Sequence, residues 1–157
     1  YRLLHAPEDV LPCYVEQILR EPRIRDVIAL SRRANVLLHG IGTAEEMARR
    51  RGMDDETTLA LIAKGAVGEA FGYYFNARGE IVYSTASVGL RLHDLSNIGK
   101  VVAVAGGRSK AWAILAVLST GRCHVCITDE GAARRVMRLK ERTQTEGGVT
   151  DDSQDWD

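Results

Sequence analysis

Basic residues directly follow a glycine pair near the middle of the chain. An apolar run at residues 101–105 ends at Gly106 and Gly107, and Arg108 and Lys110 come next. Glycine lets backbone N–H groups come close to a ligand, and the start of a helix adds unpaired N–H groups and a positive dipole end. The pattern therefore predicts a site for an anion such as phosphate. An ordinary strand-to-helix turn with two solvated basic residues has the same pattern and stays open as an alternative.

A second glycine-bearing segment has the same design. The apolar run at residues 35–39 is followed by Gly40 and Gly42 and then by a helical pattern at residues 44–51, whose last turn contains Arg50. Strands that each lead into a helix favour a parallel sheet, and ligands bind at the carboxyl ends of such strands. We therefore expect both segments to line one crevice, although the helix dipole alone also favours basic residues at a helix end.

Candidate binding residues are dispersed over the expected strand ends and helix starts. Cations and backbone N–H groups suit a phosphate, and a carboxylate can accept hydrogen bonds from sugar hydroxyls. The set consists of Gly40, Gly42, Thr43, Arg50, Glu69, Gly106, Gly107 and Lys110. The sequence has no G-x-G-x-x-G motif, no Walker lysine and no G-x-S-x-G motif, so dinucleotides, nucleoside triphosphates and α/β-hydrolase chemistry are poorly supported.

The histidines and cysteines offer weaker patterns. His5 and His39 are expected at strand ends, where they either flank the crevice or are hydrogen-bonded structural residues. Cys123 and Cys126 form a C-x-x-C pair inside an apolar run, and a structural zinc site would need four ligands when only Cys13 remains as a third thiolate. We therefore expect buried strand cysteines and no metal site.

The order of apolar runs predicts the fold class. Strands are expected at residues 1–5, 35–39, 101–105 and 123–128, with a hairpin at residues 71–84 and a further strand at residues 87–92. Helical spacing predicts helices at residues 8–20, 24–33, 44–51, 54–64, after Gly107 and at 129–140. Alternation of strands and helices indicates an α/β domain with a mostly parallel, Rossmann-like sheet, helices on both faces and an inserted β-hairpin.

Composition narrows the class of protein. The chain has 157 residues, 45% of them hydrophobic, and a formal net charge of zero, so one domain can form and no overall basic field favours nucleic acid. No apolar segment is long enough to span a membrane, and three cysteines fit a reducing cytoplasm. Residues 143–157 are expected to form an acidic disordered tail. The first residues lack a signal peptide and an initiator methionine, so we expect a piece of a longer protein.

Several ordered blocks together resemble a known family. They lie at residues 66–76 with Gly79, 87–89, 104–111 and 127–133, preceded by residues 39–42 and 47–51. In this order they resemble the effector-binding domain of SorC-type sugar-responsive bacterial transcriptional regulators, over nearly the whole chain up to about residue 140. The resemblance implies a fold similar to sugar-phosphate isomerases and glucosamine-6-phosphate deaminase. Residues 1–142 would be the C-terminal part of such a domain.

The resemblance also implies a function. The domain would bind a sugar phosphate, with fructose-1,6-bisphosphate the expected effector, without turnover and without a cofactor. Its partners would be further copies of the chain in a dimer or tetramer, and DNA would be bound only through an N-terminal domain absent from this chain. A membrane partner is not expected.

Residue by residue, the resemblance assigns three ligand contacts. Arg50 would pair with a phosphate, Glu69 would accept from sugar hydroxyls, and Lys110 would hold a phosphate or a ring oxygen. The family domain starts earlier, with a glycine- and threonine-bearing phosphate loop and a further arginine, and this chain begins downstream of both.

Two alternatives to a sensor stay open at this stage. The first is a sugar-phosphate isomerase or deaminase, which needs a carboxylate base and a partner acid at one sugar carbon. Glu69 with His39 or Asp129 is the combination that the sequence offers. The second alternative is a purely structural or interaction module, which the apolar strands would also allow.

Overall fold

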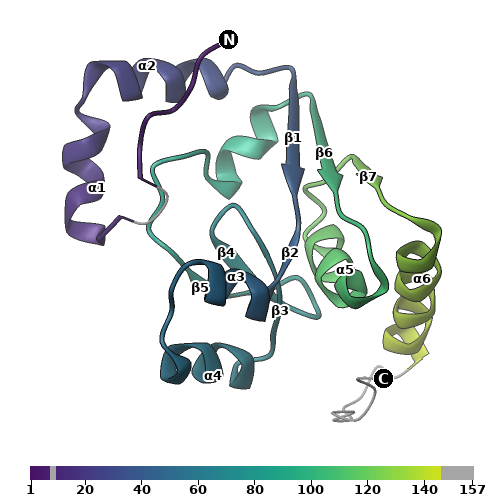
Figure 1. Cartoon of the computed structure of the whole chain (residues 1–157). Coiled ribbons are helices and arrows are strands. Elements are labelled where there is room, and N and C mark those ends of the chain that lie inside the picture. The colour runs from purple at the N-terminus through teal and green to yellow at the C-terminus, as the bar shows by residue number, and fades with distance from the viewer. Residues whose placement is uncertain (8–9, 146–157) are drawn as a thin grey trace.

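The computed structural model describes residues 1–7 and 10–145 of the chain (Figure 1). Within these ranges the chain alternates between helices and strands. The helices are α1 (Pro12–Leu19), α2 (Pro22–Ser31), α3 (Ala44–Arg50), α4 (Asp55–Ala63), α5 (Ala111–Ser119) and α6 (Glu130–Thr145), with 3-10 turns η1 (Leu92–Asn97) and η2 (Arg108–Lys110). The strands are β1 (Val36–Gly40), β2 (Gly42–Thr43), β3 (Ala66–Ala70), β4 (Tyr73–Asn76), β5 (Ile81–Ser84), β6 (Lys100–Val104) and β7 (Val125–Ile127).

The strands form two sheets. A parallel sheet has the order β1-β6-β7, and an antiparallel sheet has the order β2-β3-β4-β5. The α/β class, the parallel sheet and the inserted hairpin are confirmed. The sequence did not predict that the two-residue strand β2 pairs with β3, where Gly42 lies opposite Glu69. With this pairing, the predicted hairpin becomes part of a separate four-stranded sheet. Because β1 ends at Gly40 and β2 begins at Gly42, the chain passes from one sheet to the other at Ile41.

Helix α5 forms the centre of the main hydrophobic core. Six of its residues are buried, and it packs against β3, where Gly68 lies directly against Ala113. Val101 and Ala103 of β6 are fully buried in the same core as Ile114 of α5. The helix thus lies between the parallel sheet and the antiparallel sheet and holds them together by apolar burial.

The other face of the parallel sheet is solvent-exposed in the part of the chain that the structure describes. Side chains alternate between the faces of a strand, so the neighbours of the buried residues point away from α5. This outer face consists of Val36, Leu38, Val104, Val125 and Ile127, which are between 39% and 66% exposed. The expected second helical layer over this sheet is therefore not among the described elements.

A smaller core lies between the antiparallel sheet and helices α3 and α4. It contains Ala44, Ala48, Leu61 and the fully buried Tyr74. The start of each helix is capped as the sequence suggests. The Thr43 hydroxyl accepts from the Glu46 N–H at 3.3 Å, and the Asp54 carboxylate accepts from the Thr57 N–H at 2.6 Å. The caps fix where α3 and α4 leave the sheet.

Some predicted element boundaries are wrong. Residues 1–5 form no strand and are exposed, so His5 does not lie at a strand end. Residues 87–92 form a loop and enter η1, because the chain there packs under α2 instead of extending the sheet. Helix α6 continues to Thr145, so the first residues of the expected tail are helical, and residues 146–157 lie outside the described part.

No helix among the described residues is long and apolar enough to cross a membrane.

Candidate functional site

The carboxyl ends of the parallel strands meet at one edge of the sheet (Figure 1). Gly40, the last residue of β1, pairs with Val104 at the end of β6, which in turn pairs with Ile127 at the end of β7. The turns that follow these strands therefore lie side by side. The structure thus brings the segment at Gly40 and Gly42 together with the segment at Gly106 and Gly107.

A carboxylate of the same chain closes the turn after β6. Gly107 has a φ of +96°, which glycine adopts without strain, and its N–H donates to Oδ2 of Asp129 at 2.5 Å. The Ala132 N–H donates to Oδ1 of Asp129 at 2.9 Å. Both hydrogen bonds stabilise the ionised form and lower the pKa of the Asp129 carboxyl group. A side chain at Gly106 would crowd this carboxylate, because its Cβ would lie 2.9 Å from Oδ2.

Lys110 connects the two glycine segments. Its Nζ donates to the carbonyl oxygen of Ile41, between Gly40 and Gly42, at 3.4 Å. The same Nζ lies 3.8 Å from Oε2 of Glu46 on α3. An ion pair of this length between partly exposed side chains contributes little, so the ammonium group can exchange this partner for a ligand anion.

Arg50 lies on the face of α3 that Lys110 contacts. It is the last residue of α3 and follows Glu46 by four positions, which places both residues on one side of the helix. Its side chain is exposed, whereas that of Arg51, the next residue, is turned inward. Arg49, the other exposed arginine of α3, is paired with Glu45 at 2.7 Å, so Arg50 is the α3 arginine that we assign to this edge beside Lys110.

Glu69 belongs to the same region, but its carboxylate is engaged by the protein. The residue is 4% exposed, and its Oε1 accepts from the Gly72 N–H at 2.6 Å and from Nη2 of Arg51 at 3.2 Å. The neighbouring Tyr74 is fully buried, and burial raises its pKa to about 12. The sequence prediction missed Arg51 as the partner of Glu69. The signal available in the sequence was that Arg51 directly follows Arg50 in the run Arg49-Arg50-Arg51.

His39 contacts cysteine and aromatic side chains instead of a carboxylate. Its Nδ1 lies 3.0 Å from the Gly40 carbonyl oxygen and its Nε2 lies 3.5 Å from Sγ of Cys123. The centre of its ring lies 4.4 Å from that of Phe71, with the two rings tilted by 40°. A protonated Nδ1 donating to the carbonyl leaves Nε2 to accept from the thiol. Burial lowers the pKa of His39 and raises that of Cys123, so both groups stay neutral near pH 7.

These contacts bear on the enzyme and metal alternatives. Glu69 is bonded to Arg51 and Gly72, and Asp129 to two backbone N–H groups, so neither carboxylate is paired with His39. Cys123 precedes β7 and Cys126 lies within it, and both are half-buried. The strand expected at residues 123–128 is therefore shorter at both ends, Val125–Ile127. The described residues contain no group of three or more His, Cys, Asp or Glu side chains that could hold a metal ion.

Comparison with known proteins identifies the class of this domain. A family model described as "Putative sugar-binding domain" matches residues 1–138, and the chain belongs to this family. Among solved structures, a SorC family transcriptional regulator from Enterococcus faecalis matches with a TM-score of 0.78 and 41% identity, over 87% of this chain and 56% of that one. A sugar-binding domain of a transcriptional repressor from Vibrio fischeri matches with a TM-score of 0.74 and 27% identity, over 88% and 58%. The resemblance to SorC-type regulators is therefore confirmed.

Curated relatives point to one kind of regulator. The chain is 46% identical over 139 residues to the Central glycolytic genes regulator of Priestia megaterium, which covers 88% of this chain and 40% of that protein. It is 44% identical over 138 residues to the regulator of the same name from Bacillus subtilis, covering 88% and 41%. The chain thus spans about 40% of the length of these relatives.

Proposed function

We propose that the chain is the effector-binding part of a bacterial transcriptional repressor of glycolytic or other sugar-use genes and that it is not an enzyme. Its effector is a sugar phosphate, with fructose-1,6-bisphosphate the first to test. The observation that carries the proposal is the position of Lys110, which joins the two glycine turns at the carboxyl edge of the parallel sheet in a chain of the sugar-binding family.

In the proposed site, one set of protein groups binds the phosphate of the ligand and another binds its sugar hydroxyls. Lys110 and Arg50 supply charge for phosphate, and the glycine segments let the ligand approach the backbone closely. Glu69 accepts from sugar hydroxyls through its carboxylate, while Arg51, whose Nη2 lies 3.2 Å from Oε1 of Glu69, holds that group in position. Because the site needs no redox or metal chemistry to bind a sugar phosphate, no cofactor takes part.

The remaining parts of the assignment concern the whole protein. DNA is bound by an N-terminal domain outside this chain, and effector binding changes the contacts between copies of a homodimer or homotetramer. The protein acts in the cytoplasm and has no membrane partner. The curated relatives support this reading because they are transcriptional regulators of which the chain matches about 40%.

Isothermal titration tests the effector. Fructose-1,6-bisphosphate is titrated into this chain and into a protein extended toward the N-terminus to the length of the relatives. We expect binding to the extended protein and an affinity loss of about tenfold or more for Lys110→Met, because a charge-assisted hydrogen bond is lost. Lys64→Met, at the exposed end of α4, is the matched control and should bind like the unmodified protein.

The assignment fails on either of two results. One is the absence of heat with fructose-1,6-bisphosphate and with other hexose and triose phosphates in the extended protein. The other is equal affinity of the Lys110→Met and Lys64→Met variants. Turnover of glucosamine 6-phosphate or ribose 5-phosphate would instead support the enzyme.

A further inference from the structure

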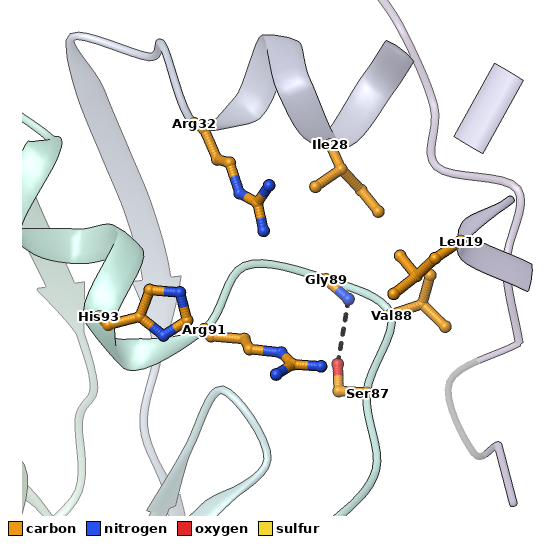
Figure 2. Close-up of a pocket in the computed structure, with 8 residues that line it drawn as sticks. All are labelled: Leu19, Ile28, Arg32, Ser87, Val88, Gly89, Arg91 and His93. Atoms are coloured by element: carbon orange, nitrogen blue, oxygen red, sulfur yellow. Dashed lines mark hydrogen bonds between the residues drawn. The ribbon is translucent and has the colours of Figure 1, made fainter. Parts of the chain in front are cut away.

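A cavity lined by both polar and apolar side chains lies at the opposite end of the parallel sheet from Lys110. It has a volume of about 250 Å³, is partly open to solvent, and is lined by residues of α1, α2 and the segment that leads from β5 into η1 (Figure 2). Arg32 precedes β1 by four residues and His93 precedes β6 by seven, so both belong to the amino ends of these strands. The cavity is therefore separate from the carboxyl edge that carries Lys110.

Two guanidinium groups reach this cavity from different elements. Arg32 follows α2, and Arg91 lies just before η1. Figure 2 shows the Arg32 side chain extending from α2 toward the loop and the Arg91 side chain running toward Ser87. Nε of Arg32 is 3.0 Å from Oδ1 of the buried Asp94, yet the Arg32 side chain remains 51% exposed. The backbone N–H of Arg91 donates to Oδ2 of Asp94 at 2.9 Å, which fixes the start of the loop. Asp94 thus positions both residues. It contacts the Arg32 guanidinium at Nε and Arg91 at the backbone N–H.

The remaining polar lining also offers a donor. The Ser87 hydroxyl oxygen accepts from the Gly89 N–H at 3.2 Å, so its hydrogen is free to point into the cavity. Two positive charges face one carboxylate, whose oxygens are already occupied by Arg32 and the Arg91 backbone. His93 lies at the rim, 3.5 Å from Asp94. A cavity with guanidinium and hydroxyl donors and this balance of charge favours an anion.

The opposite wall of the cavity is apolar. Leu19 of α1, Ile28 of α2 and Val88 of the loop point toward one another in Figure 2. Two guanidiniums approaching from different directions match the several oxygens of a tetrahedral phosphate better than a planar carboxylate, which one guanidinium fork can saturate. The apolar wall suits the carbon part of an ester. A volume of about 250 Å³ fits a ligand with few carbon atoms.

We propose that this cavity binds a small phosphate monoester, with Arg32 and Arg91 on the phosphate and Leu19, Ile28 and Val88 against the carbon chain. The site is independent of the proposed effector site. Because Arg32 belongs to the helical segment and Arg91 to the loop before η1, the ligand joins α1 and α2 to the rest of the domain.

Solution NMR on the ¹⁵N-labelled chain tests the site. Propyl phosphate and inorganic phosphate are titrated at constant ionic strength while the amide signals of Gly89 and Arg91 are followed. We expect saturable shifts of both signals, tighter binding of propyl phosphate than of inorganic phosphate, and a loss of about tenfold or more for Arg91→Gln. Arg23→Gln removes a charge from an exposed position of α2 outside the cavity and should leave the titration unchanged.

Three kinds of result overturn the proposal. The first is the absence of shifts at Gly89 and Arg91 up to about 20 mM propyl phosphate. The second is an equal effect of Arg91→Gln and Arg23→Gln, or equal affinity for both phosphates. The third is loss of the shifts in Lys110→Met, which would assign them to the carboxyl edge. The Lys110→Met titration also keeps this test apart from that of the effector site, since the second site should still bind when Lys110 is replaced.

Discussion

The side chain of Asp129 changes what the glycine turn after β6 can offer a ligand. A turn of this kind attracts anions through its backbone N–H groups, but the Gly107 N–H already donates to the Asp129 carboxylate. The same carboxylate caps α6 through Ala132. In the proposed effector site, the charge for a phosphate is therefore assigned to the side chains of Lys110 and Arg50 more than to the turn itself.

Replacing Asp129 with asparagine should alter stability in a pH-dependent way. Its hydrogen bonds lower the folded-state pKa below the ordinary value of 3.8, so the ionised carboxylate stabilises the fold at pH values above the unfolded-state pKa. This contribution is lost as the pH falls through the lower, folded-state pKa. In urea unfolding we expect Asp129→Asn to be less stable than the unmodified chain at about pH 7, with the difference closing below about pH 4. A difference that stays constant over this range would contradict the assigned hydrogen bonds.

At the scale of elements, the contact between β3 and α5 determines how closely the two sheets approach. A Cβ at Gly68 would lie 2.7 Å from Cα of Ala113 and 3.1 Å from its carbonyl oxygen. Both neighbouring atoms are backbone, so the helix would have to move as a unit. The glycine is needed here for close approach rather than for an unusual backbone conformation.

Gly68→Ala should therefore destabilise the domain, and Gly40→Ala should not. We expect a loss of about 1–3 kcal/mol for Gly68→Ala because the added methyl overpacks the contact. Among the described residues, a Cβ at Gly40 would meet one atom within 4 Å, the Val104 carbonyl oxygen at 4.0 Å, so the change should stay within about 0.5 kcal/mol. Urea unfolding of both variants measures the free energies. Equal stability of the two variants would show that α5 does not pack against β3 at this distance.

The local sequence pattern predicted the helices and strands better than it predicted which strands and side chains pair with one another. The apolar run at residues 101–105 and the glycines after it predicted β6 and its turn. Both features depend on residues that are adjacent in the sequence, so a local pattern is enough to predict them. The short strand β2 was missed, since two residues carry no period and its pairing with β3 depends on a distant segment. The ion pair of Arg51 with Glu69 was missed for the same reason: 18 positions separate the partners.

At the scale of the whole molecule, polar sites occupy both ends of the parallel sheet and the apolar contacts lie between them. The carboxyl edge carries Lys110 and Arg50, and the amino end carries the cavity with Arg32 and Arg91. The helix α5 fills only one side of the sheet that separates these ends. Among the described residues, most of the apolar burial against this sheet therefore lies on the α5 side.

Substitutions at two valines of β6 compare the contribution of the two faces of the sheet to stability. Val101 is fully buried and Val104 is 40% exposed on the outer face. Removing the two methyl groups of Val101 loses their transfer free energy and leaves a cavity, so we expect Val101→Ala to cost about 2 kcal/mol in the free energy of unfolding, against less than about 1 kcal/mol for Val104→Ala. Urea unfolding at several protein concentrations provides the measurement. Equal costs would mean that the outer face is covered in solution, and a midpoint that rises with concentration would then assign the cover to a second copy of the chain.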